Sequence, residues 1–150
     1  MTRKNLRIFL DTSVIFAAIL SPTGGARKIF LLAEAGILTL VVGPTVLMDV
    51  EEVVRRKAPG SLSTLAQLLA VSNVETSGKP SSAQIKSAKA YVQYVPDARV
   101  LAEAICAHPD WFVTHDKEHF LKSRAKIQLS FEIGTPGDVI QKFKDDFSLI

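Results

Sequence analysis

The chain has 150 residues, of which 47% are hydrophobic and 22% are charged, with a net charge of +3 and a single cysteine. These values exclude long-range disorder, an intrachain disulfide and a cysteine-based zinc framework. No apolar run approaches the roughly 18 residues that a membrane span needs, so we expect one cytoplasmic domain over residues 1–150 with no membrane segment.

Strands are predicted where short apolar or β-branched runs occur, and helices where apolar residues recur every three or four positions. In the first half of the chain these elements are a strand over 7–10, a helix over 26–36, a strand over 38–43, and helices over 45–57 and 61–70. In the second half they are a strand or extended link over 71–76, a loop over 78–82, helices over 82–95 and 98–108, a strand over 111–114, a short helix over 117–123, a strand over 127–133 and a helix over 135–147. This alternation predicts an α/β protein, a three-layer α/β/α sandwich around a central, mainly parallel sheet.

Carboxylates follow the predicted strands. Asp11 ends the first strand, Asp116 comes two residues after the WFVT strand, and Asp97 begins the helix that leads into that strand. Asp49 lies in the first turns of the helix after the second strand. Because the carboxyl ends of parallel strands share one edge, where ligands bind in such sheets, we expect these acids to gather there.

Several carboxylates at one point raise each other's pKa and need a cation to neutralise them. Oxygen ligands suit Mg²⁺ or Mn²⁺, and the chemistry expected of such a site is phosphodiester hydrolysis. The alternative is that the acids only cap helices, a role that the sequence around Asp11 and Asp97 also fits.

At these residues the sequence resembles the PIN-domain family, in particular its VapC-like toxin members. The resemblance extends from about residue 8 to about residue 143 and is carried by IFLDTSVIFAAILSPTGGARKIF, VVGPTVLMDVEEVV, PDARVLAEAICAHPDWFVTHDKEHF and TPGDVIQKF. It implies a PIN-like fold in which Asp11, Asp97 and Asp116 bind the metal. It also implies supporting positions at Thr12, Ser13, Thr114 and, more loosely, Glu118.

The second acid of the family pattern is ordinarily Glu, and here the register places Asp49 on it. Asp is one methylene shorter, so its carboxylate would reach a metal through water. Glu52, one helical turn further on, is the rival for this position.

The resemblance further implies cleavage of RNA with Mg²⁺ or Mn²⁺, a homodimer and, for toxin members, a small antitoxin protein that covers the site. Arg27 and Lys28 begin a helix near the loop after Asp11, so they are candidates for RNA phosphate contact, against the alternative of a solvated charged face. His115 and His119 are four residues apart, but a zinc site would need more ligands than the sequence offers nearby.

Two other classes compete with a nuclease. One is a non-catalytic PIN-like module that binds RNA or protein, which the Asp at position 49 keeps open. The other is a phosphotransferase with a strand-end aspartate as nucleophile. Dehalogenase-type phosphatases need a second acid two residues after the first, where this chain has Ser13, so this class fits worst.

Overall fold

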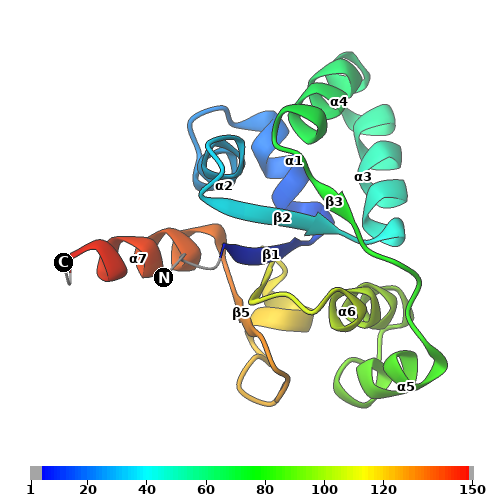
Figure 1. The fold of residues 1–150 in the computed structure, drawn as a ribbon. Helices are drawn as coiled ribbons and strands as arrows, with labels where there is room; N and C mark the ends of the chain where they lie inside the picture. Colours follow the sequence, from blue (N-terminus) through cyan, green and yellow to red (C-terminus); the bar gives the residue numbers. More distant parts are fainter. Residues whose placement is uncertain (1–4, 149–150) are drawn as a thin grey trace.

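A computed structural model describes residues 5–148. Figure 1 shows a central sheet with helices on both sides. Along the chain the elements are β1 (Leu6–Leu10), α1 (Thr12–Leu20), α2 (Gly25–Glu34), β2 (Leu38–Val42), α3 (Pro44–Lys57), the 3-10 turn η1 (Pro59–Ser61), α4 (Leu62–Val71), β3 (Glu75–Thr76), α5 (Ser82–Tyr91), α6 (Val95–Ala107), β4 (Trp111–Val113), the π-helical turn η2 (Lys117–Leu121), β5 (Glu132–Gly134) and α7 (Pro136–Ser148).

The five strands form one parallel sheet in the order β3-β2-β1-β4-β5. The chain moves outward from β1 to β2 and β3, then returns to β4 on the other side of β1. Because crossovers between parallel strands are right-handed, this reversal places α1 to α4 on one face and α5 and α6 on the other, as Figure 1 shows. The predicted three-layer α/β fold is confirmed, and the strand order reverses between β1 and β4.

Strands β1 and β4 are buried over Ile8–Leu10 and Phe112–Val113, which explains the apolar runs IFL and WFV in their sequences. Phe9 and Phe112 are both fully buried, and their rings stack with centroids 5.7 Å apart. Phe120 of η2 packs on Phe112 at 4.8 Å, so the segment after β4 is held against the sheet. Leu10 pairs with Val113, which brings the carboxyl ends of β1 and β4 to the same level.

Helix α1 was not among the predicted elements. Its sequence, TSVIFAAIL, is apolar on nearly every side and rich in β-branched residues, so it shows no helical period. The structure explains this because Val14, Ile15, Ala18 and Ile19 are all buried. In the described part of the chain no single helix is long and apolar enough to cross a membrane; α1 and α2 reach the threshold only together, bent by 94°.

The boundary between α5 and α6 differs from the prediction. The helix predicted over 82–95 ends at Tyr91, and the next begins at Val95 rather than at residue 98. Pro96 therefore does not stop a helix but lies in the first turn of α6, where its missing N–H costs nothing.

Two predicted strands are shorter in the structure. The segment predicted over 71–76 contributes only Glu75–Thr76, because α4 continues to Val71. The strand predicted over 127–133 is reduced to Glu132–Gly134, because its first half runs as a loop beside β4.

Candidate metal centre

Asp11 leaves β1 at the carboxyl edge of the sheet and is only 9% exposed. Its Oδ1 accepts a hydrogen bond from the backbone N of Thr12 at 2.9 Å. Its Oδ2 accepts hydrogen bonds from the hydroxyls of Thr114 at 2.7 Å and Ser13 at 3.4 Å. Asp11 is thus the N-cap of α1, as the capping alternative expected, but it is also tied to the strand beside it.

Two hydroxyl groups join the end of β1 to the end of β4. Thr114 Oγ1 donates to Asp11 and accepts from the backbone N of Asp116 at 2.9 Å. Ser13 Oγ donates to Asp11 and accepts from the backbone N of His115 at 3.1 Å. Because each hydroxyl bridges both segments, the position of Asp116 is fixed relative to that of Asp11.

Asp97, Asp116 and His119 form a compact group. Each offers one ligand atom, and these atoms all lie within 4.8 Å of one another. Nδ1 of His119 lies 3.1 Å from Oδ2 of Asp116, with which it shares a hydrogen bond, and 2.9 Å from Oδ2 of Asp97. The approach to Asp97 lacks hydrogen-bond geometry, so within the described residues this buried oxygen has no hydrogen-bond partner.

Asp97 does not cap its helix. The N-cap of α6 is Tyr94, and Asp97 stands in the first turn. Burial raises the pKa of Asp97 to about 6; the nearby His119 opposes this rise, whereas the charges of Asp116, Asp11 and Asp49 add to it. The charges of the other three predicted acids therefore all influence Asp97.

The pKa of Asp11 is raised as well, chiefly by burial. The hydrogen bonds from Thr114, Thr12 and Ser13 oppose the rise, and the charge of Asp116 adds to it. The pKa of Asp11 is raised even though three groups donate hydrogen bonds to its carboxylate, and no positive charge is among the causes that act on it.

Asp49 and Glu52 differ in their coupling to this group. Partial burial raises the pKa of Asp49, with a further contribution from Glu52 and an opposing one from Arg99. Asp97 is influenced by the charge of Asp49, whereas Glu52 is exposed and has no such effect on Asp97. The arrangement favours Asp49 over Glu52 as the acid that faces the group.

His119 is a member of the group that sequence reasoning left out. The hydrogen bond with Asp116 is the main cause of its raised pKa, and the charges of Asp97, Asp116 and Glu118 add to it. The signal available in the sequence was the spacing of three between Asp116 and His119, which puts both on one side of a helical turn. Glu118 itself is exposed and lies at the rim.

Glu103 is a second residue that the sequence analysis missed. It is only 3% exposed, and its carboxylate accepts hydrogen bonds from Thr45 N at 2.9 Å and Thr45 Oγ1 at 2.5 Å. Glu103 thereby accepts a backbone hydrogen bond at the start of α3, the helix that carries Asp49. The N-cap residue Gly43 has no side chain that could accept it. The available signal was an acid inside the apolar run VLAEAICA, since a buried carboxylate must find partners.

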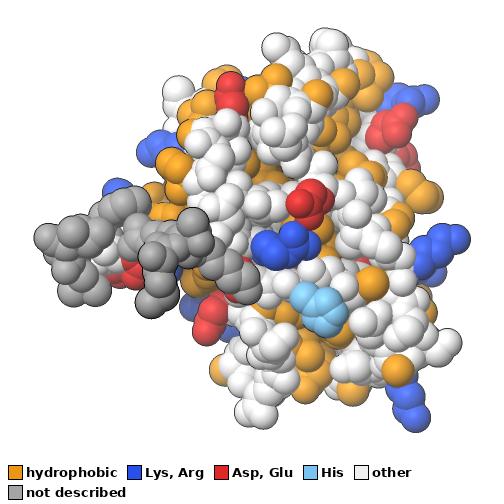
Figure 2. All heavy atoms as spheres, viewed as in Figure 1, with side chains coloured by type: hydrophobic (Ala, Val, Ile, Leu, Met, Phe, Trp, Pro, Cys, Tyr) orange, Lys and Arg blue, Asp and Glu red, His pale blue; other side chains and the backbone are white. Residues whose placement is uncertain are grey.

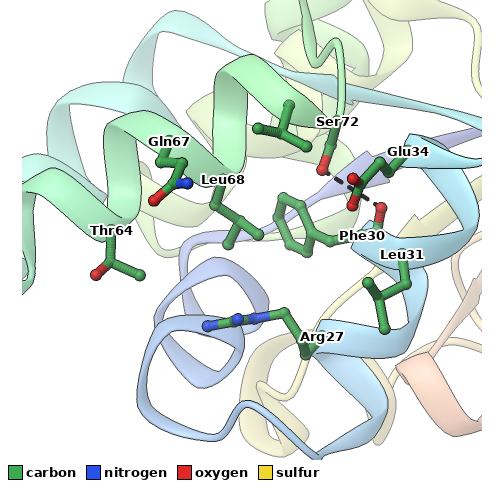
Figure 3. Close-up of a pocket in the computed structure, with 9 residues that line it drawn as sticks. Arg27, Phe30, Leu31, Glu34, Thr64, Gln67, Leu68 and Ser72 are labelled. Atoms are coloured by element: carbon green, nitrogen blue, oxygen red, sulfur yellow. Dashed lines mark hydrogen bonds between the residues drawn. The ribbon is translucent and has the colours of Figure 1, made fainter.

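The two predicted RNA-contacting residues lie on α2. Arg27 donates from Nε to the backbone oxygen of Ala18 at 2.8 Å and lines a pocket of about 330 Å³ between α2 and α4. Figure 3 shows its side chain extended below Phe30 and Leu68. Lys28 is exposed. On the face seen in Figure 2, Lys and Arg side chains stand apart rather than in one continuous band.

The residues at the carboxyl edge fit a divalent cation. The donor set is dominated by carboxylate oxygens, and the buried Oδ2 of Asp97 has no hydrogen-bond partner among the described residues. The site also lies where the strand order reverses between β1 and β4, the usual ligand position in sheets of this kind. Of the three predicted metal ligands, Asp97 and Asp116 belong to the group whose ligand atoms lie within 4.8 Å of one another; Asp11 is not in that group but is coupled to both by charge.

Comparison with known proteins agrees with this geometry. The family model of the PIN domain matches residues 7–118, a span that holds every acid of the site. In fold, the chain is similar to a chain in the crystal structure of VapBC2 from Rickettsia felis bound to a DNA fragment from their promoter. That similarity has a TM-score of 0.59 at 16% identity and covers 85% of this chain and 97% of that chain. No curated protein matches at a significant level.

Proposed function

The chain belongs to the PIN-domain family, and we propose that it is a nuclease that hydrolyses RNA phosphodiester bonds with the help of Mg²⁺ or Mn²⁺. One observation carries the proposal. Asp11, Asp97 and Asp116 come from three separate segments, yet they meet at the carboxyl edge, where the pKa of Asp97 is raised to about 6. Burial is the main cause of this raised pKa and the charges of the other acids add to it, so the arrangement favours a bound cation.

In this proposal some side chains of the site bind the ion, and others position the side chains that bind it. When bound, a divalent cation supplies a water of lowered pKa and positive charge beside the phosphate. Asp11, Asp97 and Asp116 bind it, and Thr114 keeps Asp11 and the backbone of Asp116 in register through its two hydrogen bonds. His119 positions the carboxylate of Asp116. No side-chain nucleophile is needed in this scheme.

We propose further that the chain acts as the toxin of a type II toxin–antitoxin pair. Support comes from the family and from a fold similar to that of a chain in the VapBC2 complex. In this proposal a small antitoxin covers the acidic edge, and the nuclease is a homodimer. Light scattering of the purified chain, alone and with the product of a small adjacent reading frame, measures both assemblies.

The test is cleavage of RNA by the purified chain with Mn²⁺ or Mg²⁺, with EDTA, and with single Asp→Asn changes. Asp11→Asn, Asp97→Asn and Asp116→Asn should each lower the rate by about 100-fold or more, because each removes charge that holds the ion. Asp145→Asn, an exposed acid on α7, is the matched control and should keep full activity. The variants also separate true activity from contaminating ribonuclease, which would survive in all of them.

The same assay shows whether Asp49 or Glu52 is the second acid of the site. Asp49→Asn should lower the rate strongly, whereas Glu52→Gln should change it by less than about threefold, because only Asp49 is coupled to Asp97. If no RNA is cleaved and calorimetry detects no metal binding, the chain is a non-catalytic binding module instead.

A further inference from the structure

Tyr94 places an aromatic ring in solvent next to the metal centre. It is 56% exposed, and no Phe, Trp or other Tyr side chain that the structure describes is as exposed. It precedes α6, three residues before Asp97, and its backbone oxygen accepts the hydrogen bond from Ala98 N at 2.9 Å. The ring is therefore anchored by the helix that carries one of the site acids.

One face of the Tyr94 ring is already stacked. The ring of His119 lies parallel to it, with centroids 5.2 Å apart and an interplanar angle of 15°. Nδ1 of the same His119 is 2.9 Å from Asp97 and 3.1 Å from Asp116. The stack thus begins at the acids and ends at Tyr94, whose exposure leaves ring surface open to solvent.

An exposed flat ring aligned in this way is suited to a second flat ring. We propose that Tyr94 stacks on a nucleobase of single-stranded RNA, on a nucleotide adjoining the phosphate held at the acids. The inference rests on the proposed ribonuclease function and adds a base-binding position to it. Stacking on an aromatic side chain tolerates any base, because every base has a π-face. The position would therefore strengthen binding without selecting a sequence.

Binding of eight-nucleotide oligomers by fluorescence anisotropy tests the position. All proteins carry Asp11→Asn to prevent cleavage, and the probes are oligouridine, oligoadenosine and an abasic ribose-phosphate oligomer. Tyr94→Ala should weaken binding of both base-containing oligomers by about 5-fold to about 100-fold, since stacking contributes that much per base. Tyr94→Phe should stay within about twofold, because the phenyl ring still stacks. Val95→Ala is the matched control, as Val95 is also 56% exposed.

The abasic oligomer separates stacking from a structural role. If Tyr94 merely braces His119, Tyr94→Ala weakens the abasic oligomer as much as the others, and the proposal is overturned. Equal affinity of the Tyr94→Ala and parent proteins for oligoadenosine overturns it too. In either case, metal-dependent cleavage by the wild-type chain would show that the nuclease function stands without the base position. Failure of that function appears differently, as no cleavage of RNA and no binding of any of the three oligomers.

Discussion

At the scale of single residues, Asp97 links the chemistry of the site to stability. Its pKa is about 6 in the folded chain against 3.8 ordinarily, so the folded state holds this proton more tightly than the unfolded state does. The stability that this proton contributes is present below about pH 4 and is lost as pH rises through about 6. The raised pKa of His119 acts in the same direction, because protonated His119 pairs with the acids.

We therefore predict that Asp97→Asn stabilises the metal-free protein at neutral pH. In EDTA at pH 7.5 the variant should exceed the wild type by about 1 kcal/mol, or about 2–4 °C in melting temperature for a chain of this size. The difference should shrink toward zero near pH 4, where Asp97 is protonated anyway. Thermal melts from pH 4 to 8 measure it, and a variant less stable than wild type at pH 7.5 would contradict the electrostatic account.

Single residues also show where sequence reasoning was sufficient and where it was not. Asp11 and Asp116 could be placed at one edge because strand ends meet in a parallel sheet, and the structure brings them together. The place of His119 depends on the path of η2, whose packing through Phe120 on Phe112 is a tertiary event. The spacing of three between Asp116 and His119 is compatible with this contact, but it does not show that the two side chains meet Asp97.

At the scale of elements, Glu103 holds α3 against α6. Its carboxylate supplies the hydrogen bonds that the first turn of α3 would otherwise lack, and it fills the space above Gly43 so closely that a methyl group there would overlap it. The absence of a side chain at Gly43 is therefore a requirement of the Glu103 position. Through this contact, α6 sets the place of Asp49 as well as that of Asp97.

We predict that Glu103→Ala lowers the free energy of unfolding by about 2–4 kcal/mol, because it removes the two hydrogen bonds that the buried Glu103 carboxylate accepts from Thr45. Glu34→Ala, an exposed acid on α2, should change it by less than about 0.5 kcal/mol. Gly43→Ala should be strongly destabilising in the wild type but less so in the Glu103→Ala background, where the overlap with the carboxylate is gone and only the 2.8 Å approach to Cβ of residue 103 remains. Urea unfolding measures the wild type and the four variants, and additive effects of Gly43→Ala and Glu103→Ala would show that the two residues act independently.

The elements themselves were predictable to different degrees for physical reasons. Helix α3 was predicted almost to its ends, because Pro44 opens it and only one face is apolar. Helix α1 was not predicted, because a helix that is buried on most sides has no polar face and its sequence therefore shows no helical periodicity. The start of α6 was predicted wrongly at Pro96, because Pro can end a helix or open one and α6 has no side-chain cap that marks its start.

At the scale of the whole molecule, the net positive charge is small. The sequence has 18 Lys and Arg residues and 15 Asp and Glu residues, which gives a net charge of +3. The Lys and Arg side chains visible in Figure 2 stand singly. A face with this distribution can neutralise only a few phosphates at once, and the acids of the site repel RNA unless a cation is bound.

We therefore predict a shallow salt dependence for RNA binding. If about three to four phosphates are contacted, log K should fall with log[salt] at a slope of about −2 to −3, because single strands release about 0.7 counterion per contact. Affinity for oligouridine in the Asp11→Asn background would then drop by about 30-fold between 50 and 200 mM salt. Lys28→Gln should reduce the slope by about 0.7 if Lys28 contacts a phosphate, and should leave it unchanged if the residue belongs to a solvated face. A slope steeper than about −5 would require a continuous basic track of seven or more contacts, which would have to lie outside the face seen in Figure 2.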